Sequence, residues 1–194
     1  MTLSPSKDFI CFLTPIVFQP RFKLTSLLES LDFDRSFKSG RKARLFGSEP
    51  YGYGNSYHLP LKFTDNLFVS EMFNFVDELF PFLCLNSCLI NYYPDARTRS
   101  FMPDHSDNEV YIKAHTFIVT ISLGSCRNMV FKERNTGTCL LSIKLKHGDI
   151  LIFSKESQSR YTHGIPPSVN FSNTETFPSF LPRISATFRR LQNI

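Results

Sequence analysis

Apolar residues recur every three or four positions between Asp65 and Pro81. This spacing is typical of one buried face of an α-helix, and Pro81 cannot continue a helix. Asp65 is a residue type that caps helix N-termini, so we predict that the helix begins just after it. A second, shorter helix is predicted over residues 25–33. The apolar positions of the longer helix are Leu67, Phe68, Met72, Phe73, Val76, Leu79 and Phe80.

After this helix the hydrophobic pattern changes to that of β-strands. Short runs rich in β-branched and aromatic residues are separated by turn residues, which indicates an antiparallel sandwich or barrel. The helices before these runs would cover one face of the sheet. The predicted strands comprise residues 88–93, 116–123, 128–132, 140–146, 149–153 and 183–189.

Two segments near the start of the chain lack a clear period. Residues 36–55 carry several basic residues and end in a Gly/Tyr-rich sequence, which predicts a loop or hairpin. Residues 9–18 are mostly apolar, but this stretch is too short to cross a bilayer. No small-residue cleavage site follows it, so we interpret it as a buried N-terminal segment and not as a signal peptide.

Composition narrows the class of protein. A length of 194 residues suits one domain with a sizeable core, and 42% apolar with 20% charged residues fits neither a disordered chain nor a membrane bundle. The net charge of +5 favours contact with phosphate or another anionic surface. The chain has 21 Phe and 7 Tyr but no Trp, so any base stacking must use Tyr, Phe or His. Five cysteines, mostly inside apolar runs, argue against a disulfide framework and predict a reducing compartment.

Three side chains of the β region have the chemistry of a metal site. Alternate residues of an extended segment point to the same side, so His105 and Asp107 could bind one cation together. His163, which follows the predicted strand 149–153, could complete the set. Two imidazoles and one carboxylate leave open coordination positions, as in non-haem Fe(II) oxygenases. Taken alone, His105 and Asp107 could instead form an ordinary surface hydrogen bond.

The last predicted strand carries polar residues on one face. Arg183, Ser185, Thr187 and Arg189 alternate with apolar residues along it. Two guanidinium groups inside a barrel are costly to bury unless an anion meets them, and a dicarboxylate would satisfy both. Arginines at the rim, paired with acidic side chains, are the alternative.

Taken in order, these motifs resemble the AlkB family of Fe(II)- and 2-oxoglutarate-dependent nucleic-acid demethylases. The resemblance covers roughly residues 40–190, and the joint order of the motifs makes it specific. It departs from many relatives at Ser185, where they have Asn. The segments resemble the family's Asn-x-Tyr strand, His-x-Asp metal segment, the turn before a later strand, the third-ligand segment and the Arg-x-Asn/Ser-x-Thr-x-Arg strand, and they comprise residues 91–94, 105–109, 147–149, 163–165 and 183–189.

The resemblance implies a fold and a set of site residues. The fold would be mainly β with some α (α+β): a double-stranded β-helix (jelly-roll) barrel in one domain over residues 1–194, with N-terminal helices and a nucleotide-recognition lid in 1–87 and the barrel core in 88–194. Fe(II) would be held by His105, Asp107 and His163. The 2-oxoglutarate would be held by Asn91, Tyr93, Arg183, Ser185, Thr187 and Arg189, with the two arginines on its carboxylates. Glu109 would read the exocyclic amine of the damaged base, and the lid would contain Tyr51, Tyr53, Arg41, Lys42 and Phe46.

The function implied is oxidative demethylation with Fe(II), 2-oxoglutarate and O2. The substrate would be single-stranded RNA or DNA carrying N1-methyladenine or N3-methylcytosine, whose positive charge suits Glu109. The chain looks most like the AlkB domains of plant RNA virus replicase polyproteins, which implies repair of viral RNA in the host cytoplasm. We expect a cytoplasmic monomer that has no membrane partner.

Other interpretations stay open at this point. A 2-oxoglutarate oxygenase acting on a protein or small molecule would keep the metal residues and the last strand without needing Glu109 or Tyr51. A jelly-roll module that only binds would tolerate the loss of His105. Tyr51 and Tyr53 could form an ordinary turn, and the basic residues of 38–44 a solvated loop. The remaining histidines, His58, His115 and His147, are expected to be structural or exposed.

Overall fold

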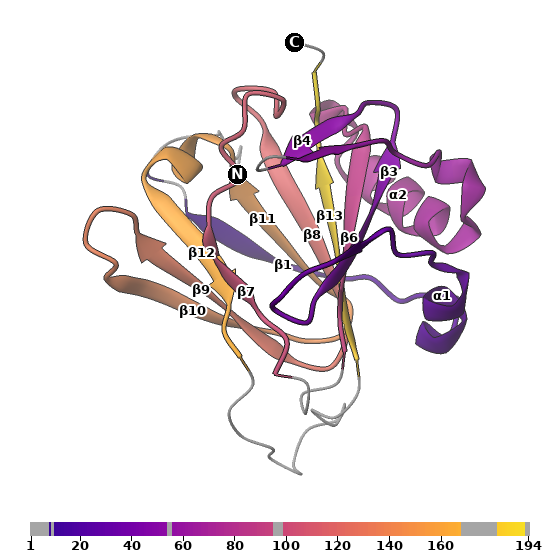
Figure 1. The fold of residues 1–194 in the computed structure, drawn as a ribbon. Helices are drawn as coiled ribbons and strands as arrows, with labels where there is room; N and C mark the ends of the chain where they lie inside the picture. The colour runs from indigo at the N-terminus through magenta and orange to yellow at the C-terminus, as the bar shows by residue number, and fades with distance from the viewer. Residues whose placement is uncertain (1–7, 9, 54–55, 95–98, 168–181, 193–194) are drawn as a thin grey trace.

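A computed structural model of the chain describes residues 8, 10–53, 56–94, 99–167 and 182–192. Two antiparallel sheets face each other in it, and a short hairpin lies beside one end of the barrel (Figure 1). The larger sheet has the order β1 (Cys11–Val17), β11 (Asp149–Ser154), β8 (Phe117–Gly124), β13 (Arg183–Arg189), β6 (Ser87–Tyr93), β3 (Lys42–Gly47) and β2 (Arg35–Ser36). The smaller sheet has the order β10 (Cys139–Leu145), β9 (Arg127–Glu133), β12 (Tyr161–Ile165) and β7 (Met102–His105), and the hairpin pairs β4 (Tyr51–Tyr53) with β5 (Ser56–His58).

The two sheets pack against each other through a shared apolar core. Ile118, Leu151 and Phe153 of the larger sheet meet Met129 and Phe131 of the smaller sheet there. Two antiparallel sheets closed around such a core form a jelly-roll barrel, which confirms the predicted fold class. All the predicted strands are present in it, within one or two residues of their expected bounds.

Two helices cover the outer face of the larger sheet: α1 (Leu24–Ser30) and α2 (Leu67–Leu79) (Figure 1). Leu27, Val69, Met72 and Val76 of these helices pack against the apolar side of β13 and its neighbours. Because both faces of the larger sheet are covered, strand β8, next to the central strand β13, is buried along its whole length. Short 3-10 turns are formed by η1 (Phe63–Asp65), η2 (Pro81–Leu83) and η4 (Glu156–Ser159). Among the described residues, no helix is long and apolar enough to span a bilayer, and all five cysteines are free thiols.

The start of α2 differs by one residue from the prediction. The N-cap is Asn66, whose side-chain oxygen accepts hydrogen bonds from the backbone N–H groups of Phe68 and Val69, each at 3.1 Å. Asp65 ends η1 instead, where its carboxylate accepts a hydrogen bond from the backbone of Lys62. Asp and Asn are both good caps, so two such residues in a row leave the boundary open in the sequence.

Three other expectations need correction. Residues 42–47 form strand β3, which pairs with β2 as a hairpin, so of the predicted loop or hairpin over 36–55 the hairpin is present and the loop is wrong for these residues, where Lys42 and Arg44 alternate with the buried Ala43 and Leu45. Residues 11–17 form the edge strand β1, most of whose side chains are exposed, so the predicted buried segment is wrong. Helix α1 ends at Ser30, three residues before the predicted end at residue 33.

Replacement of Asn66 by Ala should lower the free energy of unfolding by about 1–2 kcal/mol, because two backbone N–H groups of α2 lose their cap. The upper part of this range is expected, since the Asn66 amide also donates to the Ser30 hydroxyl at 2.9 Å and so connects α2 to α1. Urea unfolding followed by circular dichroism measures the change. Asn74→Ala is the matched control, because Asn74 lies exposed on the same helix. Equal losses in the two variants would contradict the assignment of the cap.

Candidate active site

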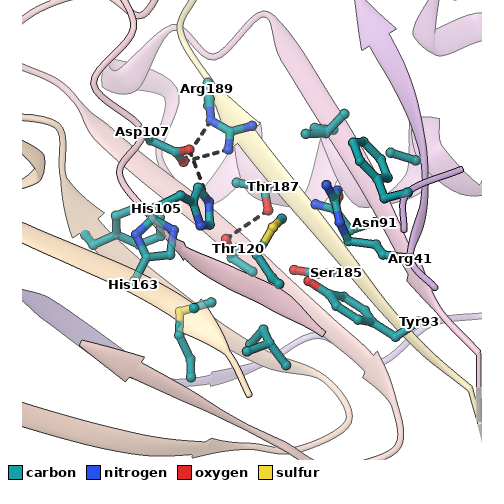
Figure 2. A pocket seen from close by; sticks show the side chains of 18 of the residues that line it. Arg41, Asn91, Tyr93, His105, Asp107, Thr120, His163, Ser185, Thr187 and Arg189 are labelled. Carbon is teal, nitrogen blue, oxygen red and sulfur yellow. Dashed lines mark hydrogen bonds and ion pairs between the residues drawn. The ribbon is translucent and has the colours of Figure 1, made fainter. Parts of the chain in front are cut away.

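The structure brings together the three residues predicted to bind metal (Figure 2). His105 ends β7, and His163 lies directly opposite it in β12, with 4.3 Å between the ring centroids. Asp107 follows β7 by two residues, and its Oδ1 is 3.7 Å from His105 Nε2. One potential ligand atom from each residue lies within 4.8 Å of the others, so the three could hold one metal ion.

Asp107 is held by a buried ion pair with Arg189 of β13. Its Oδ2 accepts hydrogen bonds from Arg189 Nε at 3.1 Å and Nη2 at 2.6 Å. Its Oδ1 has no hydrogen-bond partner among the residues that the structure describes, and it faces the imidazoles. Burial alone would raise the pKa of Asp107, but the charge of Arg189 outweighs it, with help from His163 and His105, and lowers the pKa to about 2. The carboxylate is therefore charged, anchored through one oxygen and open at the other.

Both histidines are held in the neutral form that binds metals. Burial, and then the neighbouring His105, lower the pKa of His163 to about 3, and burial also lowers the pKa of His105. The His105 Nδ1 lies 3.0 Å from the carbonyl oxygen of Pro103, which can only accept a hydrogen bond. The proton is thus on Nδ1, and the Nε2 lone pair is available. Two neutral imidazoles and one open carboxylate oxygen fit the donor set of an Fe(II) site.

A pocket extends from these residues along the inner face of the larger sheet. Ser185, Thr187 and Arg189 of β13 line it, as do Asn91 and Tyr93 of β6. Figure 2 shows the histidines at one end of this pocket and Tyr93 at the other. Five of the six residues predicted to hold 2-oxoglutarate therefore share the pocket with the metal residues.

Arg183 lies deeper than the other five and is not among the residues that line the pocket. Its side chain is 0% exposed, and its guanidinium carbon is 5.1 Å from the centroid of the Tyr93 ring. Nη2 donates to the Ser122 hydroxyl at 3.0 Å, whereas Nε and Nη1 have no hydrogen-bond partner within the described ranges. A buried cation with two open donors fits the carboxylate of an anionic ligand. Arg189 differs, because Asp107 already occupies its guanidinium.

Two of the predicted lid residues, Tyr51 and Arg41, line the pocket, whereas Phe46 and Lys42 do not. Tyr51 is buried and lines the pocket, with its ring centroid 5.7 Å from the guanidinium carbon of Arg189. Arg41 lines the pocket as well, but as part of its wall: it donates a hydrogen bond from Nη1 to Asn91 Oδ1 and stacks 3.7 Å over the Phe37 ring. The side chain of Tyr53 lies outside the described part of the chain.

One of the lid predictions, Phe46, needs correction, and another, Lys42, stays a prediction. Phe46 is 1% exposed and packs in the core between the larger sheet and α2, so it does not contact the pocket. Lys42 lies exposed on β3, four residues before Phe46 and therefore on the same side of the strand. Because side chains alternate along a strand, only Ala43 and Leu45 of β3 face the pocket side, where Ala43 lines the pocket.

Glu109 lies close to Asp107, Arg189 and Tyr51 but does not line the pocket. Its side chain is half-buried. Burial, and then the charge of Asp107, raise the pKa of Glu109 against the opposing effect of Arg189. The acidic residue predicted to read the base therefore stands near the tyrosine that lines the pocket.

Two further residues of the site have little or no signal in the sequence. Gln158, in η4, accepts hydrogen bonds from the His163 ring and from the Asp107 backbone, yet it lies in a polar stretch with no periodicity. His58 lines the pocket beside Tyr51, its partner in the hairpin, although we expected it to be structural or exposed. Burial lowers the pKa of His58. Its position next to Tyr57, at the end of the Gly/Tyr-rich stretch, is the only signal in the sequence.

Comparison with known proteins agrees with this geometry. A jelly-roll barrel with a buried His-Asp-His cluster is the architecture of an Fe(II) oxygenase, and residues 45–189 match the 2OG-Fe(II) oxygenase superfamily. The chain belongs to this superfamily, whose cofactor and co-substrates are the predicted Fe(II), 2-oxoglutarate and O2.

Within the superfamily the chain is similar to AlkB-like proteins. It is 24% identical over 113 residues to the human DNA oxidative demethylase ALKBH2, covering 55% of this chain and 40% of that protein. It is 26% identical over 117 residues to the DNA N(6)-methyladenine demethylase ALKBH1D of Arabidopsis thaliana, covering 58% of this chain and 26% of that protein. The chain thus spans less than half the length of these curated relatives. The solved structure of OsALKBH1 shares the fold, with a TM-score of 0.53, 17% identity and coverage of 90% of this chain and 84% of that one.

Replacement of Arg189 by Met should lower the free energy of unfolding by about 3 kcal/mol at pH 7, because it leaves Asp107 as an uncompensated buried charge. The carboxyl pKa is about 2 in the folded protein and about 3.9 in an unfolded chain. The stabilisation from this group is therefore present above pH 4 and is lost as the pH falls towards 2. The difference in stability between wild type and variant should narrow over the same interval. Urea unfolding at pH 7, 5 and 3 tests this.

The double variant Asp107→Asn with Arg189→Met is the control for this pair. It removes both charges, so its loss of stability should be smaller than the sum of the two single losses. A strictly additive result, or a loss independent of pH, would show that the pair does not stabilise the barrel as described.

Proposed function

We propose that this protein is an Fe(II)- and 2-oxoglutarate-dependent oxidative demethylase that removes N-methyl groups from nucleic-acid bases. The observation that carries the proposal is the cluster of His105, Asp107 and His163, with one free carboxylate oxygen, at the end of a pocket lined by β13. These three residues would hold the iron. The printed names of the relatives ALKBH2 and ALKBH1D as DNA demethylases support a nucleic-acid base as the substrate.

The other end of the pocket would hold 2-oxoglutarate. Its distal carboxylate would meet the open donors of Arg183 and the hydroxyl of Tyr93, and Asn91 would contact the part nearer the metal. Ser185 and Thr187 line the wall between these ends, and Thr187 accepts a hydrogen bond from Thr120 at 3.3 Å. Because these side chains lie on two paired strands, the protein presents a rigid polar wall to the co-substrate.

Fe(II) with bound 2-oxoglutarate and O2 supplies the oxidising power to hydroxylate an N-methyl group, which then leaves as formaldehyde while 2-oxoglutarate becomes succinate and CO2. The residues of the chain position the partners and keep water away from them. Asp107 stays charged because Arg189 holds it, and the histidines stay neutral because they are buried. The three ligands therefore need no change of protonation before the metal binds.

Tyr51 and Glu109 would recognise the base. A base turned into the pocket would meet the Tyr51 ring, and the Glu109 carboxylate would attract the positive charge of N1-methyladenine or N3-methylcytosine. Single-stranded substrates avoid the cost of unpairing, about a few kcal/mol per base. The resemblance to AlkB domains of plant RNA virus replicases makes RNA the first substrate to test, with DNA beside it. On the same resemblance we propose a monomer acting in the cytoplasm, which is the host cytoplasm if the protein is viral.

The purified chain, given Fe(II), 2-oxoglutarate and ascorbate, should release formaldehyde from RNA or DNA oligonucleotides that carry N1-methyladenine. Mass spectrometry should show the loss of one methyl group. His105→Ala and Asp107→Ala should abolish turnover while circular dichroism keeps the wild-type spectrum. Succinate formed without demethylation would point to a protein or small-molecule substrate, and turnover that survives in both variants would refute the metal assignment.

Replacement of Arg183 by Met should raise the KM for 2-oxoglutarate by about 10- to 100-fold, the loss expected for a charge-assisted hydrogen bond. Arg183→Lys keeps the charge, so its KM for 2-oxoglutarate should lie between those of wild type and Arg183→Met. In the absence of co-substrate the Met variant should be at least as stable as wild type, because it removes a buried cation with open donors. Arg160→Met, at an exposed position, is the control. An unchanged KM together with a large loss of stability would assign Arg183 a structural role only.

A further inference from the structure

The turn before β12 connects two of the three metal ligands through one side chain. Gln158, in η4, is 0% exposed. Its Oε1 lies 3.3 Å from the backbone nitrogen of Asp107 and 3.0 Å from Nδ1 of His163. Its Nε2 lies 3.2 Å from the Ser157 hydroxyl and 3.5 Å from the Ser154 carbonyl. Every polar atom of this buried amide therefore has a partner.

The hydrogen bonds define which way the amide points. The Asp107 backbone N–H can only donate, so the Gln158 atom facing it is the oxygen, and the same oxygen faces His163. An amide oxygen cannot donate, so the His163 ring carries its proton on Nδ1. The lone pair of His163 is then on Nε2, the ring atom that remains for a metal. One acceptor thus sets the tautomer of one ligand and anchors the backbone of another.

The turn itself is held on its other side. Arg134, just after β9, donates from Nη2 to the Gln158 carbonyl oxygen at 2.6 Å and to the hydroxyl of Ser106, the residue between His105 and Asp107. The Ser157 hydroxyl, also fully buried, donates to the Ser154 carbonyl at 2.8 Å. Because the backbone of η4 is fixed in this way, the Gln158 side chain has a defined place between the two ligand segments.

We propose that Gln158 is a positioning residue of the metal centre, which holds His163 in the Nδ1–H tautomer and Asp107 at its place through one shared acceptor. The inference depends on the metal assignment of His105, Asp107 and His163 but not on a nucleic-acid substrate. On this proposal the hydrogen-bond acceptor of the Gln158 side chain is required, and its volume alone is not enough. Two variants of similar size distinguish the effect of the acceptor from the effect of the volume. Gln158→Met fills the space without an oxygen acceptor, whereas Gln158→Glu keeps an acceptor towards both N–H groups.

The first readout is the binding of Mn(II) alone. The decrease of the electron paramagnetic resonance signal of free Mn(II) measures it. Gln158→Met should raise the Mn(II) Kd by about 10- to 100-fold, the usual effect of removing a hydrogen-bond partner of a metal-binding residue. Gln158→Glu should bind within about threefold of wild type or more tightly, since a carboxylate is a common partner of metal-binding imidazoles. Ser159→Ala is the matched control, because Ser159 lies exposed in the same turn and its hydroxyl donates to the Glu156 carbonyl, away from the metal residues.

The second readout is the tautomer of His163 in the metal-free protein, seen in two-bond proton–nitrogen correlation spectra. Wild type and Gln158→Glu should show the proton on Nδ1, and Gln158→Met should show a mixture of tautomers. If Gln158 only fills space, Met would bind Mn(II) like wild type and Glu would be the damaged variant, which would overturn the inference. Equal losses in both would overturn it too. If wild type binds no Mn(II), the metal assignment fails and takes this inference with it, whereas missing demethylation with intact Mn(II) binding refutes only the proposed substrate.

Discussion

The alternation of side chains along β13 is the constraint on which the rest of the barrel depends. Ile184, Ala186 and Phe188 point into the core under the helices, and the polar residues between them point into the barrel. This strand is central to the larger sheet, paired with β8 on one side and β6 on the other, so both of its faces are buried. The apolar face fixes the register. As a consequence, the polar face of β13 places two guanidinium groups, those of Arg183 and Arg189, inside the protein.

The two buried cations are compensated in different ways, and this difference organises the site. Arg189 has its counter-ion within the chain, and the pair keeps Asp107 charged and leaves one carboxylate oxygen towards the histidines. Arg183 has a hydroxyl and an aromatic ring beside it, and two of its donors have no hydrogen-bond partner among the described residues, which is the reason for proposing an anionic ligand there. Arg189 therefore belongs to the metal end of the pocket, whereas Arg183 lies outside the pocket lining, and its contact with 2-oxoglutarate is part of the proposal.

The sequence allowed prediction of those features that depend on period and on residue type. The strands of the barrel follow from alternation, and the cluster of His105, Asp107 and His163 follows from a His-x-Asp segment and a later His in a β context. It did not allow prediction of which side of β3 faces the pocket, because a shift of one residue reverses every side chain of a strand, and so Phe46 was placed in the lid by mistake. Gln158 has no signal in the sequence, because its role depends on contacts with three separate segments, through Asp107, Arg134 and His163.

The aromatic composition of the chain also gains a functional meaning from the packing of the two sheets. The three residues of the metal cluster come mainly from the smaller sheet, and the residues proposed to hold 2-oxoglutarate come from the larger one, so the proposed site is complete only where the sheets close on each other. At that junction the rings of Phe131 and Phe153 lie 5.7 Å and 5.0 Å from the His163 ring. Apolar rings exclude water from the imidazole, and this desolvation is the main cause of its low pKa. The same side chains that hold the sheets together therefore keep the ligand neutral, so that core packing and readiness for metal are one property of this barrel.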